Sequence, residues 1–168
     1  MNVFIGVDNG VSGSFGVITE ENYYFKKTAD FTQKETDYTK AVKYVHLIDP
    51  RLLGQWLSRW KGQNIHAMIE RPMVNPSRWR ATLSAMRCLE ATRVVFLLLG
   101  IPQVFLDSKE WQNLLLPSGL VGPAALKRAS VSVASRMFPK FEEMFRKHKD
   151  ADGMLIAEHC RRQFKSGE

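Results

Sequence analysis

The sequence contains few cysteines, and its hydrophobic runs are short. Two of the 168 residues are cysteine, Cys88 and Cys160, which is too few for a disulfide framework or a zinc cluster and indicates a reducing intracellular compartment. The longest apolar run, Val94–Leu99, is too short to cross a membrane. Met1–Val7 is followed at once by a charge and glycines, which is not the pattern of a signal peptide. We therefore expect a cytoplasmic protein that has no membrane partner.

Acidic residues are scarce in the second part of the chain. Residues 1–70 carry eight Lys/Arg and eight Asp/Glu, whereas residues 71–168 carry 16 Lys/Arg and nine Asp/Glu. The excess in the second part equals the whole net charge of +7. A neutral first part and a basic second part indicate a surface for a polyanion such as nucleic acid. The alternative is a basic protein whose charges only face solvent.

The rest of the composition is that of an ordinary globular protein, with 45% hydrophobic and 24% charged residues. The chain has no repeat, low-complexity segment or linker. We expect residues 1–168 to form one domain.

The beginning of the chain predicts a three-stranded antiparallel meander, because short apolar runs alternate with turn residues. The expected strands are Asn2–Asp8, Ser14–Ile18 and Tyr23–Phe25. Residues 26–48 are polar and weakly patterned, so no element is assigned to them. Asp49 and Pro50 then form a good helix start, an N-cap followed by proline at the first position, and Gly62 marks the end of this helix.

Strands and helices alternate in the remainder. The expected strands are Ile65–Ile69 and Gln103–Leu106, and the expected helices are Ser77–Leu99 closed by Gly100, Ser108–Leu116 capped by Ser108, Ala124–Phe138, Phe141–Lys147 and Asp152–Phe164. Two prolines make Arg71–Pro76 a loop. This order predicts an α/β fold, a mixed five-stranded sheet that starts with an antiparallel meander and is flanked by helices.

Three carboxylates stand at the ends of predicted elements. Asp8 ends the first strand, Glu70 ends the fourth, and Asp152 opens the last helix. Buried carboxylates that cluster are costly and repel one another, and a hard divalent cation such as Mg²⁺, which prefers oxygen ligands, removes both problems. The structural alternative is that Asp8 caps a turn and Glu70 pairs with Arg71.

The acids lie within a series of motifs. In order, these are Ile5–Ile18 (IGVDNGVSGSFGVI), Met68–Pro72 (MIERP), Lys109–Leu114 (KEWQNL), Lys127 ahead of Ser132–Pro139 (SVASRMFP), and Ala151–Glu158 (ADGMLIAE). They resemble the motifs of RuvC-type Holliday junction resolvases, particularly the phage-encoded branch. The first motif alone is unspecific. All of them in register cover nearly the whole chain.

This resemblance implies a ribonuclease H-like fold and a homodimer that cuts branched double-stranded DNA, above all four-way junctions. It makes Asp8, Glu70 and Asp152 the catalytic acids, which bind two Mg²⁺ ions per active site, with Mn²⁺ as a substitute. The reaction implied is phosphodiester hydrolysis without a covalent intermediate or a nucleotide cofactor. A phage-encoded enzyme would act in the host cytoplasm.

One position departs from the family pattern. Its members carry a fourth acid, or sometimes a histidine, three residues before the last aspartate, and this offset of one helical turn directs both groups to one site. Here that position is Lys149, between His148 and Asp150. A lysine there predicts competition with the metal and a poor nuclease. Asp150 supplies the missing metal ligand instead if the backbone around it is not helical.

Basic residues and two apolar side chains near the second motif form the expected DNA surface. The predicted DNA-binding residues are Arg71, Met73, Arg78, Trp79, Arg80, Lys127 and Arg128. The basic members would contact phosphates without reading sequence. Met73 or Trp79 would act as a wedge that unstacks bases at the junction, or would pack at the dimer interface.

Three other functions remain open from the sequence. The first motif also resembles the phosphate-binding hairpin of actin-like ATPases and sugar kinases, although the chain has no second such motif. Lys149 in the place of an acid is consistent with a catalytically weak junction-binding protein. A ribonuclease H-like nuclease acting on replication forks or RNA–DNA hybrids is the third alternative.

Overall fold

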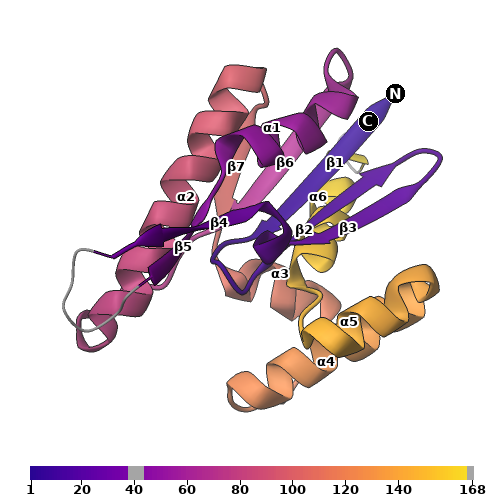
Figure 1. The fold of residues 1–168 in the computed structure, drawn as a ribbon. Coiled ribbons are helices and arrows are strands. Elements are labelled where there is room, and N and C mark those ends of the chain that lie inside the picture. Colours follow the sequence, from indigo (N-terminus) through magenta and orange to yellow (C-terminus); the bar gives the residue numbers. More distant parts are fainter. Residues whose placement is uncertain (38–43, 166–168) are drawn as a thin grey trace.

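The protein is built around a mixed five-stranded sheet (Figure 1). The structure is a computed structural model that describes residues 1–37 and 44–165, so residues 38–43 of the polar segment and 166–168 of the expected domain lie outside the described residues. The strands are β1 (Asn2–Asp8), β2 (Ser14–Thr19), β3 (Tyr23–Lys27), β6 (Asn64–Glu70) and β7 (Gln103–Leu106). Their order is β3-β2-β1-β6-β7. The pairs β1–β2 and β2–β3 are antiparallel, whereas β1–β6 and β6–β7 are parallel, which confirms the predicted meander and sheet.

Helices cover both faces of this sheet (Figure 1). They are α1 (Pro50–Leu57), α2 (Trp79–Leu99), α3 (Ser108–Leu115), α4 (Pro123–Met137), α5 (Glu142–His148) and α6 (Asp152–Lys165). Along the described residues, no helix combines the length and the apolar composition that crossing a membrane requires.

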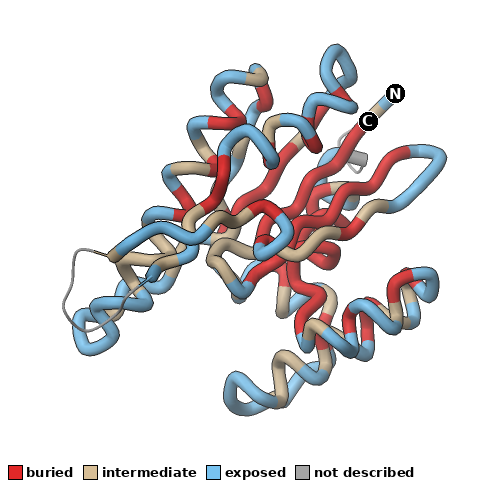
Figure 2. Tube along the Cα trace, in the orientation of Figure 1, coloured by how far each residue is buried: buried red, intermediate tan, exposed pale blue. Residues whose placement is uncertain are grey.

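The two faces of β1 belong to two separate hydrophobic cores, because successive side chains of a strand point to opposite sides. Val3, Ile5 and Val7 face α1 and α2, and Phe4 faces α3, α4 and α6. Figure 2 shows this central part of the sheet as buried throughout. Such burial on both faces explains why β1 is almost entirely apolar up to its terminal carboxylate.

The polar segment left unassigned contains a hairpin-like second sheet. β4 (Thr32–Thr36) and β5 (Tyr44–Ile48) pair antiparallel, and β5 packs against α2. Most of these residues are exposed or only half buried, so the segment has little apolar patterning and its strands are hard to recognise in the sequence.

Several predicted helix ends need correction. The short helix at Ser108 is capped by Asp107, not by Ser108, and Asp107 forms a capping box with Glu110. α2 begins at Trp79 rather than Ser77, after a 3₁₀ turn at Pro76–Arg78. α1 ends at Leu57, five residues before Gly62, because a 3₁₀ turn at Ser58–Trp60 follows it. The left-handed Gly100, with φ of 69°, closes α2 as predicted.

Candidate metal centre

Two of the predicted acids leave the central sheet side by side. β1 and β6 are parallel neighbours in which Val7 pairs with Ile69, so the next residues, Asp8 and Glu70, emerge from the same end of the sheet. Carboxyl ends of parallel strands are the usual place for ligand sites in such sheets. The first and the fourth of the strands expected from the sequence, β1 and β6, are thus neighbours in the sheet.

Helix α6 brings a third acid to this end of the sheet. It lies directly on β1 and β2, and glycines allow this approach: a Cβ on Gly6 would meet the Ala157 nitrogen at 2.1 Å, and one on Gly153 would meet the Ser14 oxygen at 2.4 Å. The close packing places Asp152, the first residue of α6, beside Asp8.

Asp150 joins the same group because the backbone before α6 is not helical. α5 ends at His148, and Lys149 adopts a left-handed conformation with φ of 60°. This turn directs the side chain of Asp150 inward, where it is buried, while Lys149 remains exposed. The condition under which Asp150 was expected to serve as a ligand is thus met by the backbone.

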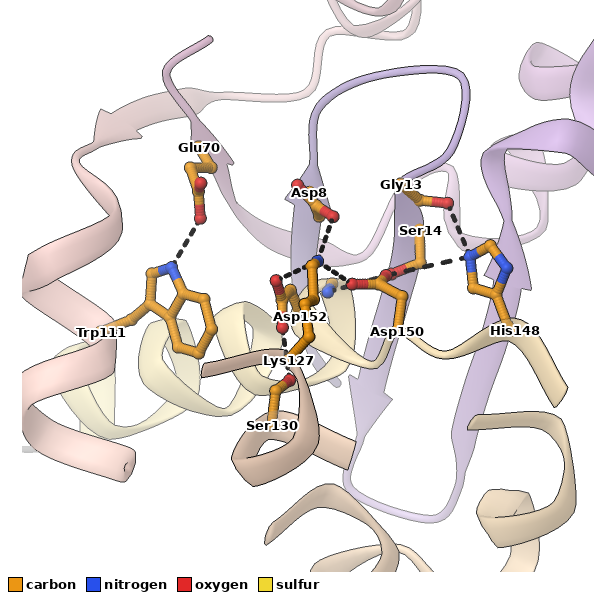
Figure 3. Close-up of polar contacts among 11 residues, drawn as sticks. Asp8, Gly13, Ser14, Glu70, Trp111, Lys127, Ser130, His148, Asp150 and Asp152 are labelled. Atoms are coloured by element: carbon orange, nitrogen blue, oxygen red, sulfur yellow. Dashed lines mark hydrogen bonds and ion pairs between the residues drawn. The ribbon is translucent and has the colours of Figure 1, made fainter. Parts of the chain in front are cut away.

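The three aspartates form a tight cluster (Figure 3). One carboxylate oxygen from each of Asp8, Asp150 and Asp152 lies within 4.8 Å of the others. The ammonium of Lys127 lies among them, 3.4 Å from Asp8 Oδ2 and 2.5 Å from Asp152 Oδ2, and it also donates to Asp150 Oδ1. Lys127, which is predicted to bind DNA, thus also pairs with all three aspartates.

Two serines orient these carboxylates. The Ser14 hydroxyl donates to Asp150 Oδ2 at 2.7 Å and accepts the Gly153 N–H at 3.1 Å, so it links β2, the turn and α6. The Ser130 hydroxyl donates to Asp152 Oδ1. Fixed carboxylates lose less freedom when they bind an ion, which is what a preorganised site requires.

Glu70 stands to the side of this cluster (Figure 3). Its Oε2 accepts a hydrogen bond of 2.7 Å from the indole N–H of the fully buried Trp111. Among the described residues, the acids close enough to share one ion are the three aspartates, and Glu70 is outside that group. The predicted acids Asp8, Glu70 and Asp152 therefore lie at one end of the sheet. Asp150 belongs to the aspartate cluster, whereas Glu70 lies beside it.

The electrostatics of the cluster favour a bound cation. Burial, followed by the negative charge of Asp150, raises the pKa of Asp8 well above its ordinary range, and the same two causes raise the pKa of Asp152. Burial also raises the pKa of Glu70, against the opposing effect of the Trp111 hydrogen bond. Burial acts to lower the pKa of Lys127, but the three carboxylates outweigh it and the net shift is upward. The Lys127 ammonium therefore stays charged, but its single positive charge is not enough to neutralise three carboxylates.

This donor set fits a divalent metal ion. Converging, partly buried carboxylate oxygens are the ligands that hard cations such as Mg²⁺ and Mn²⁺ take, and the uncompensated repulsion among them is what such an ion relieves. Asp8, Asp150 and Asp152 can therefore hold a metal ion at the end of β1.

Comparisons with known proteins identify the fold. No family model matches the chain, and no curated protein sequence matches it. It is similar to T. thermophilus RuvC in complex with a Holliday junction substrate, with a TM-score of 0.57 and 13% sequence identity over 92% of this chain and 90% of that one. A second Thermus thermophilus RuvC structure matches with a TM-score of 0.52 at the same identity and coverage. The fold is ribonuclease H-like, as in RuvC.

The remaining predicted DNA-binding residues lie around this ribonuclease H-like core in two places. Arg71, Met73 and Arg78 line a cavity of about 260 Å³ that also reaches Glu70, and Trp79 and Arg80 are exposed at the start of α2. Met73 is 82% exposed. Arg71 pairs with Asp107 at 3.1 Å and not with Glu70. The structural alternative, in which Glu70 forms an ion pair with Arg71, is therefore wrong. Arg128 lies elsewhere, on α4.

Three supporting residues were not predicted from the sequence. Trp111 lies inside the KEWQNL motif, and this position is the signal from which a hydrogen bond to a catalytic acid could have been predicted. Ser130 follows Lys127 by three positions on α4, a spacing that places both on one helix face. Ser14 carries no sequence signal, because its role depends on how α6 packs.

Proposed function

We propose that this protein is a metal-dependent endonuclease that cuts branched DNA, with four-way junctions as its preferred substrate. The observation that carries the proposal is the cluster of Asp8, Asp150 and Asp152 at the end of β1 in a ribonuclease H-like fold. The similar T. thermophilus RuvC was solved with a Holliday junction substrate, which supports branched DNA as the substrate class. The basic second part of the chain supports a polyanionic partner.

In this proposal Asp8, Asp150 and Asp152 hold the metal, and Glu70 completes the set of catalytic acids. Bound Mg²⁺, or Mn²⁺ in its place, would supply an activated water and stabilise the leaving oxygen, with two ions per active site. Ser14 and Ser130 keep the carboxylates in place.

Lys127 and Glu70 have separate tasks at the edges of the site. The side chain of Lys127 is 44% exposed, so its ammonium faces solvent as well as the carboxylates and can contact a phosphate that reaches the cluster. The Trp111 hydrogen bond favours the ionised form of Glu70, which is the form that binds a cation. The Trp111 hydrogen bond thus opposes the rise in the pKa of Glu70 that burial causes.

DNA would approach along the exposed basic residues on both sides of the acids. On one side these are Arg71, Arg78 and Arg80, and on the other side Arg128. Met73 and Trp79, both exposed, are the apolar side chains available to insert between bases.

We also propose that the chain forms a homodimer, because symmetrical cutting of a junction requires two active sites. The supporting feature is an exposed apolar stripe on α2, formed by Val94, Leu97 and Leu98. Leu89, on the same helix, packs in the core and is not part of this stripe. The sequence motifs further support a phage origin and a host-cytoplasmic location.

The decisive test compares substrates. A synthetic four-way junction, a fork, an RNA–DNA hybrid and a linear duplex of equal length are incubated with the protein in Mg²⁺. Preferential cleavage of the junction near its crossover supports the proposal. Preferential cleavage of the hybrid or the fork transfers the function to one of the alternatives, and binding without cutting identifies a junction-binding protein.

A further inference from the structure

A basic groove between α4 and α5 opens beside the acidic cluster. It begins as a cavity of about 400 Å³ lined by Ala124, Lys127, Arg128, Val131, Arg146 and Lys149. A second cavity of about 300 Å³ shares Arg128, Val131 and Arg146 with the first and extends to Arg136. Because Lys127 both lines the groove and contacts the aspartates, the groove starts within the reach of one side chain from the candidate metal centre.

The charge of the groove is almost entirely positive. Glu142 is the acid among the lining residues, and it pairs with Arg146 at 2.6 Å. Arg128 and Lys149 are exposed, and neither belongs to an ion pair found within residues 1–37 and 44–165. Two cations that pair with none of the described acids, above a floor formed by Ala124 and Val131, suit an anionic ligand whose other atoms are apolar.

The backbone of Lys149 indicates that its side chain is needed there. Among the described residues, Lys149 is the one non-glycine residue with positive φ. Glycine is the usual residue at such a helix end, because a side chain in the left-handed region costs about 1 kcal/mol. The turn places Asp150 in the candidate metal centre and Lys149 at the lining of the groove. Of these two adjacent residues, one is thus placed to bind a cation and the other an anion.

We propose that this groove binds a phosphodiester of the strand being cut, next to the phosphate that reaches the aspartates, with Arg128 and Lys149 as its contacts. The inference rests on the proposed function and assigns the position of the substrate strand beside the site. It makes Lys149 a substrate-binding residue, whereas a lysine in the place of a metal-binding acid would oppose the metal. Binding in the groove does not require the metal ion.

The first test measures junction affinity without chemistry. Fluorescence anisotropy with a synthetic four-way junction in a chelator is recorded between 50 and 200 mM salt for the wild type, Lys149→Gly and Arg128→Ala. Each variant is expected to bind about threefold to tenfold more weakly, and each should lower the slope of log affinity against log salt by about 0.9. Lys61→Ala is the matched control, because Lys61 precedes β6 at the end of the strand opposite Glu70.

Thermal unfolding separates binding from folding. Lys149→Gly places glycine in a left-handed position that glycine prefers, so its melting temperature should equal or exceed that of the wild type. Weaker binding by a more stable variant cannot be attributed to misfolding.

The second test locates the phosphate. Neutral methylphosphonate linkages are introduced one at a time near the crossover of the junction. For the wild type, one linkage adjacent to the cleaved one should weaken binding about threefold to tenfold, and Lys149→Gly and Arg128→Ala should each lose less affinity than the wild type at that same position. If every position affects the wild type and the variants equally, the groove assignment is overturned.

The results distinguish the two proposals. A wild type that does not prefer the junction over linear duplex contradicts the proposed function and the groove together. A wild type that prefers the junction, with Lys149→Gly and Arg128→Ala matching it in affinity and salt slope, overturns the groove alone and leaves the proposed function standing.

Discussion

The helices on the two faces of the sheet differ in how deeply they are buried. On one face, all residues from 151, just before α6, to 160, within it, are buried. This helix contacts β1 and β2 through glycines. On the other face, α2 has 21 residues but buries only a few of them, and Leu98 is 80% exposed near its end. Figure 2 shows this contrast between the buried centre and the exposed helix.

This contrast indicates that side chains have to be placed precisely at the acidic cluster and not on the exposed face of α2. Acids that share an ion, as proposed here, need a closely packed backbone behind them, and α6 supplies one. The proposed dimer interface needs exposed apolar side chains, and α2 carries them.

The largest effect should come from a methyl group between α6 and the sheet. Gly6→Ala places a Cβ 2.1 Å from the Ala157 nitrogen, and two backbones would have to separate, so we expect a loss of about 3 kcal/mol or more in the free energy of unfolding. The matched control is Gly54→Ala in α1, where the nearest atom would be Val95 Cγ1 at 3.9 Å. It should gain about 0.5–1 kcal/mol, because alanine favours a helix. Urea denaturation measures both, and equal effects would contradict the account of α6.

The exposed stripe on α2 should affect association rather than folding. Leu98→Glu is expected to weaken dimerisation about tenfold or more, because a buried charge replaces an apolar contact, while the free energy of unfolding changes by about 0.5 kcal/mol at most. Analytical ultracentrifugation provides the measurement. Leu114→Glu on α3, also an exposed leucine, is the control. Identical sedimentation of both variants and the wild type would remove α2 as the interface.

The hydrogen bond from Trp111 should tune Glu70. Trp111→Phe removes a donor that lowers the pKa of Glu70, so that pKa should rise and the acidic limb of the cleavage profile should move to higher pH. We expect about a tenfold loss of rate at neutral pH and a smaller loss at alkaline pH. Trp60→Phe, in the opposite core, is the packing control. An unchanged pH profile would show that Glu70 does not act in the reaction.

The smallest effect concerns the metal-free fold. Burial and repulsion raise the pKa of Asp8 and Asp152 in the folded protein. Between the ordinary aspartate pKa and these raised values, the folded protein therefore binds more protons than the unfolded chain. The contribution of these two groups to stability falls as the pH rises through this range. In a chelator, Asp8→Asn should therefore melt a few degrees above the wild type at pH 7. The advantage should shrink as the pH is lowered toward 5. A variant that melts below the wild type at every pH would contradict this sign.

The sheet and most helices could be predicted from the sequence because their signals are local. The apolar run Asn2–Asp8, the Asp49–Pro50 helix start and the Gly100 helix end each carry their own physical cause. β4 and β5 could not be recognised, because they are largely polar and depend on contact with α2.

The candidate site was predictable only in part. Asp8, Glu70 and Asp152 stand at the ends of recognisable elements, and the motif resemblance singles them out. The direction of Asp150 depends on a left-handed lysine, and only glycine would have marked that conformation in the sequence. The position of Lys127 depends on the depth at which α4 packs, which is a tertiary property.

The central claim is that Asp8, Asp150 and Asp152 form the metal centre of a junction nuclease, and single-turnover cleavage tests it most directly. A four-way junction is mixed with excess wild-type protein or Asp150→Asn in Mg²⁺, and binding is recorded in parallel. The account predicts cleavage near the crossover by the wild type. It also predicts a loss of about a thousandfold or more in rate for Asp150→Asn with junction binding intact, because an ion that contributes several kcal/mol is lost. Cleavage by Asp150→Asn at the wild-type rate, or no cleavage by the wild type, would contradict it.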